Sequence, residues 1–330
     1  MSYLATTVVD IDKFRFIHRG TEVQVGSEEP KTNEAELWSQ LGHSTGAERA
    51  DVLVDLSHIA YERGDYQEAL ALCESAKEIY TELGESAYTS RLSHVYDGMM
   101  WCNKQLNRKT ECAESAQKAA ELLVDDEPEK YADALRTAGC FWYNAKEYER
   151  SLEFHRRALE LPYVEKTEYD SAIDNHNIAM CLQKLDRHEE AVTHFLSSRE
   201  LSKLAKKPEN VASTDYLLAH SFIELEIAVE AEFFAQKSLD YAELTNSKSD
   251  EAWSLYALGS ARVLMDQLDD ALTFFTRARD IAVNLAGRDW SLIIQLEHEI
   301  ADIMETQGNE EQANRIRARI ATIEETMGED

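Results

Sequence analysis

The sequence contains little of what β-rich and α/β folds require. Its 330 residues include only 12 glycines and 4 prolines, so few tight turns can be built. No apolar run is long enough to cross a membrane, and the amino terminus lacks the basic and apolar regions of a secretory signal. The apolar content of 44% is nevertheless typical of a chain that folds. We therefore expect a mostly helical, cytoplasmic protein with no membrane partner.

Positive charge is also scarce. The chain has 34 Lys and Arg against 63 Asp and Glu, which gives a net charge of −29. Because phosphate backbones are recognised by rows of Lys and Arg, nucleic acid is excluded as an expected partner and basic segments are favoured. The five cysteines are odd in number and none forms a C-x-x-C pair, so they indicate reduced core thiols rather than disulfides.

Sequence motifs of catalysis are missing. The chain contains no G-x-G-x-x-G, no P-loop, no G-x-S-x-G and no H-E-x-x-H. The nearest approach is His188 with His194, but six helical steps rotate about 600° and leave these side chains on different faces. The sequence therefore predicts no metal site there, no cofactor and no enzymatic activity.

A periodic pattern of small residues organises most of the chain. Successive members lie 39 to 43 residues apart, and each follows a turn residue by five positions. The small residues are Ala69, Cys112, Ser151, Ala191, Ala231, Ala271 and Ala313. The turn residues are Gly64, Asn107, Lys146, Asp186, Glu226, Asp266 and Gly308. Five of these seven are Gly, Asn or Asp, which best tolerate the left-handed backbone that ends a helix.

This spacing predicts helical hairpins. A small side chain lets two antiparallel helices approach closely, so one such residue per unit marks their crossing. Pro128, Pro162 and Pro208 all fall between units, where a helix breaker is tolerated. Length alone would suggest about two domains, but stacked hairpins need only neighbour contacts and can form one array.

Parts of these units resemble the tetratricopeptide repeat family, whose signature is Trp-x2-Leu-Gly-x2-Tyr followed by Ala-x3-Phe-x2-Ala. The sixth unit contains Leu258-Gly259 followed by Ala271, Phe275 and Ala278. The first contains Gly64-Asp65-Tyr66 followed by Ala69 and Ala76. The period near 40 is similar to the long repeats of kinesin light chains, Pins-type adaptors and bacterial peptide sensors. An armadillo or HEAT solenoid, or a generic helical array, is the alternative.

The resemblance implies an all-α fold, namely a right-handed superhelical solenoid of about seven helical hairpins spanning residues 47–330. The expected repeats occupy residues 47–84, 87–126, 129–162, 166–206, 209–245, 249–286 and 289–327. The last repeat resembles an end cap, because Ile316, Ile320, Ile323 and Met327 form a single apolar stripe while charged residues cover the rest.

Residues 1–46 differ from the repeats and form an expected amino-terminal extension. The alternation of apolar and polar residues over 12–25, with Gly20 near its centre, is a weak β-hairpin pattern. Residues 26–30 are typical of a linker, and Glu34 to Leu41 is typical of a short helix. The basic and aromatic stretch Lys13 to Arg19 leads to the hypothesis that it docks in the acidic groove or pairs with a partner strand. The alternative is a frayed or purely packing segment.

The resemblance also implies that a concave groove, lined by the first helix of each hairpin, binds the ligand. The candidate groove residues are Asp55, His58, His94, Asp97, Trp101, Arg136, Tyr143, His176, Asn177, Tyr216, His220, Trp253 and Tyr256. Ring side chains with polar ends suit a peptide groove, because they give contact area and hydrogen bonds at low entropy cost. The alternative for each aromatic is packing against the next hairpin.

These observations favour a non-enzymatic interaction scaffold that binds a protein or peptide partner of basic character, and self-association is a further hypothesis. The second hypothesis is a peptide-responsive regulator that sequesters another protein, similar to the bacterial pheromone sensors of this architecture. Two others are weaker. They are a metal-dependent enzyme that uses the groove histidines and an acidic mimic of DNA.

Overall fold

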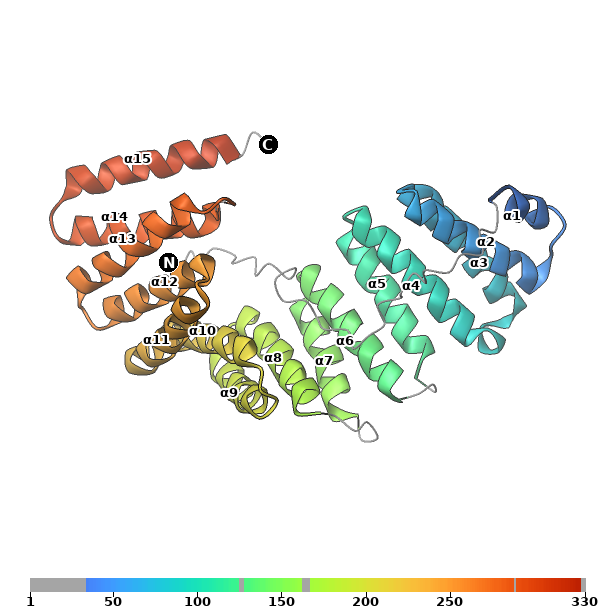
Figure 1. Cartoon of the computed structure of the whole chain (residues 1–330), viewed down its shortest axis with the longest axis horizontal. Helices are drawn as coiled ribbons and strands as arrows, with labels where there is room; N and C mark the ends of the chain where they lie inside the picture. Colours follow the sequence, from blue (N-terminus) through green and yellow to red (C-terminus); the bar gives the residue numbers. More distant parts are fainter. Residues whose placement is uncertain (1–33, 125–127, 162–166, 288, 328–330) are drawn as a thin grey trace. The chain divides into compact units, whose positions relative to one another are not determined.

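The computed structural model describes residues 34–124, 128–161, 167–287 and 289–327. The β-hairpin predicted over 12–25, the linker and the basic segment Lys13 to Arg19 lie outside these residues. Within them, the structure contains fifteen α-helices, one short 3-10 helix and no strand (Figure 1). The all-α prediction is therefore confirmed for the described chain.

The helices follow one another as antiparallel pairs. A short helix, α1 (Glu34–Leu41), lies where the sequence predicts one. The first helices of the pairs are α2 (Gly46–Glu62), α4 (Thr89–Gln105), α6 (Pro128–Asn144), α8 (Glu168–Lys184), α10 (Pro208–Glu224), α12 (Lys248–Leu264) and α14 (Trp290–Thr306). The second helices are α3 (Tyr66–Gly84), α5 (Lys109–Leu122), α7 (Tyr148–Glu160), α9 (His188–Leu204), α11 (Ala228–Thr245), α13 (Leu268–Asn284) and α15 (Glu310–Met327). The 3-10 helix η1 (Glu85–Ala87) joins the first pair to the second.

The chain divides into two compact units at residues 166 and 167. In its described part, the amino-terminal unit contains α1 to α7 and the carboxy-terminal unit contains α8 to α15. Inside each unit a helix packs mainly against the helices before and after it in the sequence. Each unit is thus a stack of hairpins whose core is distributed between neighbours, as a solenoid requires.

One left-handed residue ends the first helix of every hairpin. All seven predicted turn residues have positive φ, including Lys146 at 64° and Glu226 at 58°. The next backbone N–H then reaches back to the first helix, for example from Asp65 to the Ala60 carbonyl at 2.9 Å. This hydrogen bond satisfies a carbonyl that the helix end would leave unpaired. Lys206 and Asn246, which lie between hairpins, share the same conformation, with φ of 56° and 55°.

The seven small residues mark the helix crossings as predicted. Six of them have no solvent exposure at all, and Cys112 is 2% exposed. At a second crossing position a glycine of the first helix receives a ring from the second helix. A Cβ atom on Gly259 would lie 2.4 Å from the Phe275 ring, and one on Gly139 would lie 2.7 Å from the His155 ring. The Gly and Phe of the family signature are therefore one interlocking contact.

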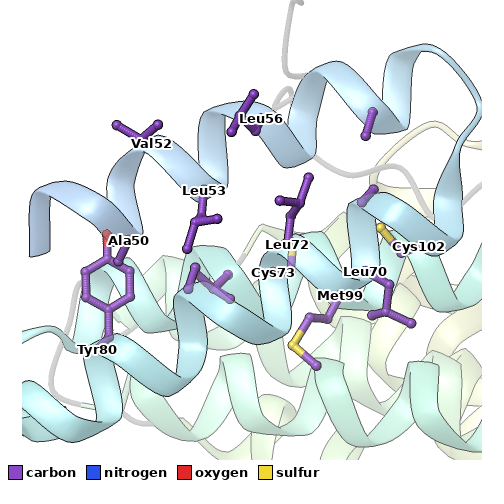
Figure 2. Close-up of a cluster of buried hydrophobic side chains, with 14 of the residues drawn as sticks. Ala50, Val52, Leu53, Leu56, Leu70, Leu72, Cys73, Tyr80, Met99 and Cys102 are labelled. Atoms are coloured by element: carbon purple, nitrogen blue, oxygen red, sulfur yellow. The ribbon is translucent and has the colours of Figure 1, made fainter. Parts of the chain in front are cut away.

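The core of the first hairpin shows how neighbouring helices share side chains. Figure 2 shows Leu53 and Leu56 of α2, Leu70 of α3 and Met99 of α4 in one buried cluster. Leu56 is 2% exposed, so this layer is closed to solvent. All five cysteines are buried and none forms a disulfide, as predicted for core thiols.

Candidate functional site

The candidate residues of the carboxy-terminal unit occupy equivalent positions on successive first helices. His176, Tyr216 and Tyr256 follow one another at intervals of 40 residues on α8, α10 and α12. His220 lies one turn after Tyr216, and Trp253 lies one turn before Tyr256. We call the surface that these five residues share the first-helix face.

Three aromatic rings cluster on the first-helix face between α10 and α12. The ring centroids of Tyr216 and Trp253 are 6.0 Å apart with an interplanar angle of 67°, and those of Trp253 and Tyr256 are 6.1 Å apart at 83°. All three side chains are half-buried. Among the described residues the indole N–H of Trp253 and the hydroxyl of Tyr216 have no hydrogen-bond partner. The cluster therefore offers both apolar area and polar groups to a ligand.

The two histidines of the first-helix face are in the neutral form, and the His176 ring packs against Phe195 on α9. Burial lowers the pKa of His176 to about 4, and burial with the nearby His188 and Lys184 lowers the pKa of His220 to about 4. The Nδ1 atom of His176 lies 3.3 Å from the Thr214 hydroxyl oxygen. These rings are therefore uncharged at neutral pH and act as hydrogen-bonding groups.

Asn177 and Gln183, both on α8, differ in their surroundings. Asn177 is only 6% exposed, so its side chain lies within the helix packing. Gln183 was not singled out from the sequence, yet its amide nitrogen lies 3.3 Å from His220 Nδ1 and 3.1 Å from the Ser221 hydroxyl oxygen. It thereby ties α8 to α10 and fixes the position of the His220 ring.

Sequence reasoning also missed two carboxylates beside the aromatic cluster, Glu224 on α10 and Glu299 on α14. Burial raises the pKa of both, and burial together with Asp302 raises that of Glu299 to about 7. Burial mainly, and secondly the negative charges of Glu299 and Glu224, raise the pKa of Tyr256, whose hydroxyl therefore lies within their electrostatic reach. The helical spacing could have identified Glu224, because it continues the stripe of Tyr216 and His220 at intervals of four residues.

In the amino-terminal unit the candidates form a separate group on α2 and α4. The rings of His58 and His94 meet edge to face with centroids 5.4 Å apart. Asp55 is close enough to both histidines to interact with their charges, although burial raises its pKa. Burial alone raises the pKa of Asp97 to about 6. Trp101 is 39% exposed, and its ring lies 5.0 Å from the Lys104 ammonium.

The last two candidates of this unit lie on α6. The Arg136 guanidinium forms an ion pair of 2.9 Å with Asp133, and the Tyr143 ring lies 5.2 Å from that of Tyr148 on α7. Tyr143 therefore contacts the second helix of its own hairpin. No group of three or more His, Cys, Asp or Glu side chains in the described chain is arranged to hold a metal ion.

The second helices of the amino-terminal unit surround a pocket of about 670 Å³ between α3, α5 and α7. The carboxylates and cations that line it are mixed, and the Lys118 ammonium already pairs with Glu121 at 2.7 Å. Trp142 forms part of its wall and is covered by the Arg150 guanidinium, 4.6 Å from the ring. This mixture favours no single ligand chemistry, in contrast to the first-helix face.

Comparisons with known proteins agree with the repeat. The sequence profile of the tetratricopeptide repeat matches residues 49–83, which cover the α2–α3 hairpin. No match was found among curated protein sequences. None of the described helices is both long and apolar enough to span a membrane.

Several solved structures have a similar fold. The apo form of the quorum sensor NprR from B. thuringiensis is 15% identical, with a TM-score of 0.58 over 88% of this chain and 80% of that one. The apo form of RapI is 14% identical, with a TM-score of 0.56 over 85% and 99%. BtubC (BKLC) from P. vanneervenii is 17% identical, with a TM-score of 0.55 over 68% and 92%. The chain thus shares a helical-repeat fold with these structures, its α2–α3 hairpin matches the tetratricopeptide repeat, and its hairpins recur at the long interval of about 40 residues.

Proposed function

We propose that the protein is a non-enzymatic adaptor that holds a peptide or short helix of basic character on its first-helix face. The observation that carries this proposal is the cluster of Tyr216, Trp253 and Tyr256 on adjacent first helices. Half-buried aromatic residues with accessible polar ends are typical binding hot spots. The packed hairpins hold these rings in place before binding, so little entropy is lost when a ligand docks.

The charge of the chain supports a basic ligand. A net charge of −29 accelerates association with cationic segments and disfavours acidic ones. The corresponding proposed contacts in the amino-terminal unit are Asp55, His58, His94, Asp97, Trp101, Arg136 and Tyr143, and His176 and His220 complete the set in the carboxy-terminal unit. Asn177 is left out because its side chain lies within the helix packing.

A peptide-display selection against the full chain tests the proposal. A selected synthetic peptide is then titrated into the wild type, Trp253→Ala and the control Phe233→Ala. Phe233 is a suitable control because it is an aromatic residue of the second helix α11 and is 53% exposed. We expect Trp253→Ala to weaken binding by about tenfold or more and Phe233→Ala to leave it unchanged. Selection of no peptide, or equal binding by both variants, would contradict the proposal.

The fold similarity to RapI and to the quorum sensor NprR supports a second candidate, a peptide-responsive regulator that sequesters another protein. In this case the peptide and the protein partner would be linked, so that binding of one changes the affinity for the other. A competition experiment discriminates the two. Peptide that releases a bound protein partner without sharing its contact surface indicates a regulator, whereas independent binding indicates an adaptor.

A further inference from the structure

Three buried carboxylates of the carboxy-terminal unit have arginine partners. The Arg199 guanidinium bonds Asp215, and that of Arg319 bonds Glu297. In the same way Arg277 donates to Glu251 at 2.6 Å. Each of these carboxylates lies on a first helix and is no more than 3% exposed, so the pairing compensates for the loss of hydration.

Glu224 and Glu299, which are less deeply buried, have no such partner among the described residues. Both are half-buried and lose hydration, which is why their pKa values are raised. Within the described chain neither carboxylate has an ion pair or a hydrogen bond. Asp302, the acidic neighbour of Glu299, is by contrast paired with Arg317 at 2.8 Å. Two partly desolvated carboxylates on α10 and α14 therefore lack the cation that Asp302 and the more deeply buried carboxylates of this unit receive from the chain itself.

The aromatic rings near these two carboxylates can accept a cation. Because the rings of Trp253 and its neighbours Tyr216 and Tyr256 meet at 67° and 83°, they form walls at an angle rather than a stack. Tyr256 also contacts the Phe275 ring at 5.8 Å, but all three rings remain partly exposed, and this exposed area can contact a guanidinium or ammonium group. Tyr256 lies within the electrostatic field of both Glu224 and Glu299, so the rings and the carboxylates act on the same region.

From this arrangement we infer that the first-helix face contains a subsite for one arginine or lysine side chain of the ligand, with Trp253 and Tyr256 as its walls and Glu299 and Glu224 as counter-charges. The inference rests on the proposed function, because it assigns the chemistry of one anchor of the bound peptide. The apolar stem of the side chain would lie along the rings, and its charged end would restore the missing ion pairs.

Two matched synthetic peptides test the subsite with the full chain. One alternates arginine and leucine, and the other replaces each arginine with citrulline, which has a similar shape and no charge. Binding is followed at physiological salt by calorimetry and by Trp fluorescence. We expect the wild type to bind the arginine peptide about tenfold more tightly than the citrulline peptide, because a bond to a charged group is lost.

The variants Glu299→Gln and Glu224→Gln should each remove most of this preference, and Glu299→Asp, which keeps the charge, should retain part of it. The control is Glu230→Gln, an exposed carboxylate on the second helix α11. The amide variants remove a desolvated charge, so they fold, and circular dichroism verifies this.

Equal binding of the two peptides by the wild type would overturn the subsite, and so would a preference that both glutamine variants retain. In either case, citrulline-peptide binding that still depends on Trp253 would leave the adaptor function intact. Failure of the subsite is thereby distinguishable from failure of the proposed function.

Discussion

The substitution His155→Phe should stabilise the protein, and increasingly so as the pH falls. His155 fills the space beside Gly139 where the fourth and sixth hairpins have Phe195 and Phe275. It is 1% exposed, and its Nδ1 atom is buried without a hydrogen-bond partner. A buried polar atom of this kind costs about 1–3 kcal/mol, which a phenyl ring would remove at every pH.

The pH dependence follows from proton linkage. Burial, and secondly the charge of Arg136, lower the pKa of His155 from 6.5 to about 3. The unfolded chain therefore takes up a proton that the folded chain excludes. Proton uptake at His155 therefore does not destabilise the fold above pH 6.5, and it lowers the free energy of unfolding progressively as the pH falls from 6.5 towards 3. At pH 5 the wild type should have lost about 2 kcal/mol relative to neutral pH through this residue alone.

Urea unfolding monitored by circular dichroism at pH 7.5 and at pH 5 measures the effect. The difference between wild type and variant matters, since other titrating groups cancel in it. The reciprocal variant Phe195→His in the fourth hairpin should introduce a similar acid sensitivity. A stability difference that stays constant between these two pH values would refute the reasoning, because it would mean that the imidazole is not excluded from protonation.

Two other substitutions test the helix crossing at Gly259 and the buried carboxylate of Asp97. Gly259→Ala should lower the unfolding free energy by about 1–3 kcal/mol, because the alanine methyl group would clash with the Phe275 ring. This loss should exceed the gain from the better helix propensity of alanine. An unchanged or higher melting temperature would contradict the interlocking contact. Asp97→Asn should raise stability by up to about 3 kcal/mol at pH 8, since the pKa of Asp97 is raised from 3.8 to about 6 and its charged form is disfavoured in the fold. In urea titrations the gain should fall to about 0.5 kcal/mol at pH 4, where the folded wild type is protonated, and a gain independent of pH would contradict the assignment.

The hairpins could be predicted from the sequence because their signals are local. A left-handed helix end and a small crossing residue must lie at a fixed separation within one hairpin, so the pattern survives even where individual residues are atypical. Lys146 and Glu226 show this, because neither favours positive φ and only their phase relative to Ser151 and Ala231 identified them. Each adopts the conformation because the surrounding helices impose it.

The candidate site was less predictable. The sequence identified Tyr216, Trp253 and Tyr256 one by one, but their contact depends on the offset of one helical turn between neighbouring repeats. The importance of Glu299 could not be predicted from the sequence. Glu299 matters because no cation from a neighbouring helix in the described part of the chain pairs with it, and those helices are distant in sequence. Ion pairing is set by the packing of several helices, and no local spacing encodes it.

The repeated backbone conformation at Lys206 and Asn246 has an evolutionary consequence. These residues are 40 positions apart, and both end a second helix with nearly the same φ. A gene segment that encodes the intervening α10–α11 hairpin could be duplicated or deleted with equivalent backbone geometry at both junctions. Variation in length among descendants of such a chain should therefore occur in steps of whole hairpins, and each step would add or remove one row of the positions that we propose to contact the ligand.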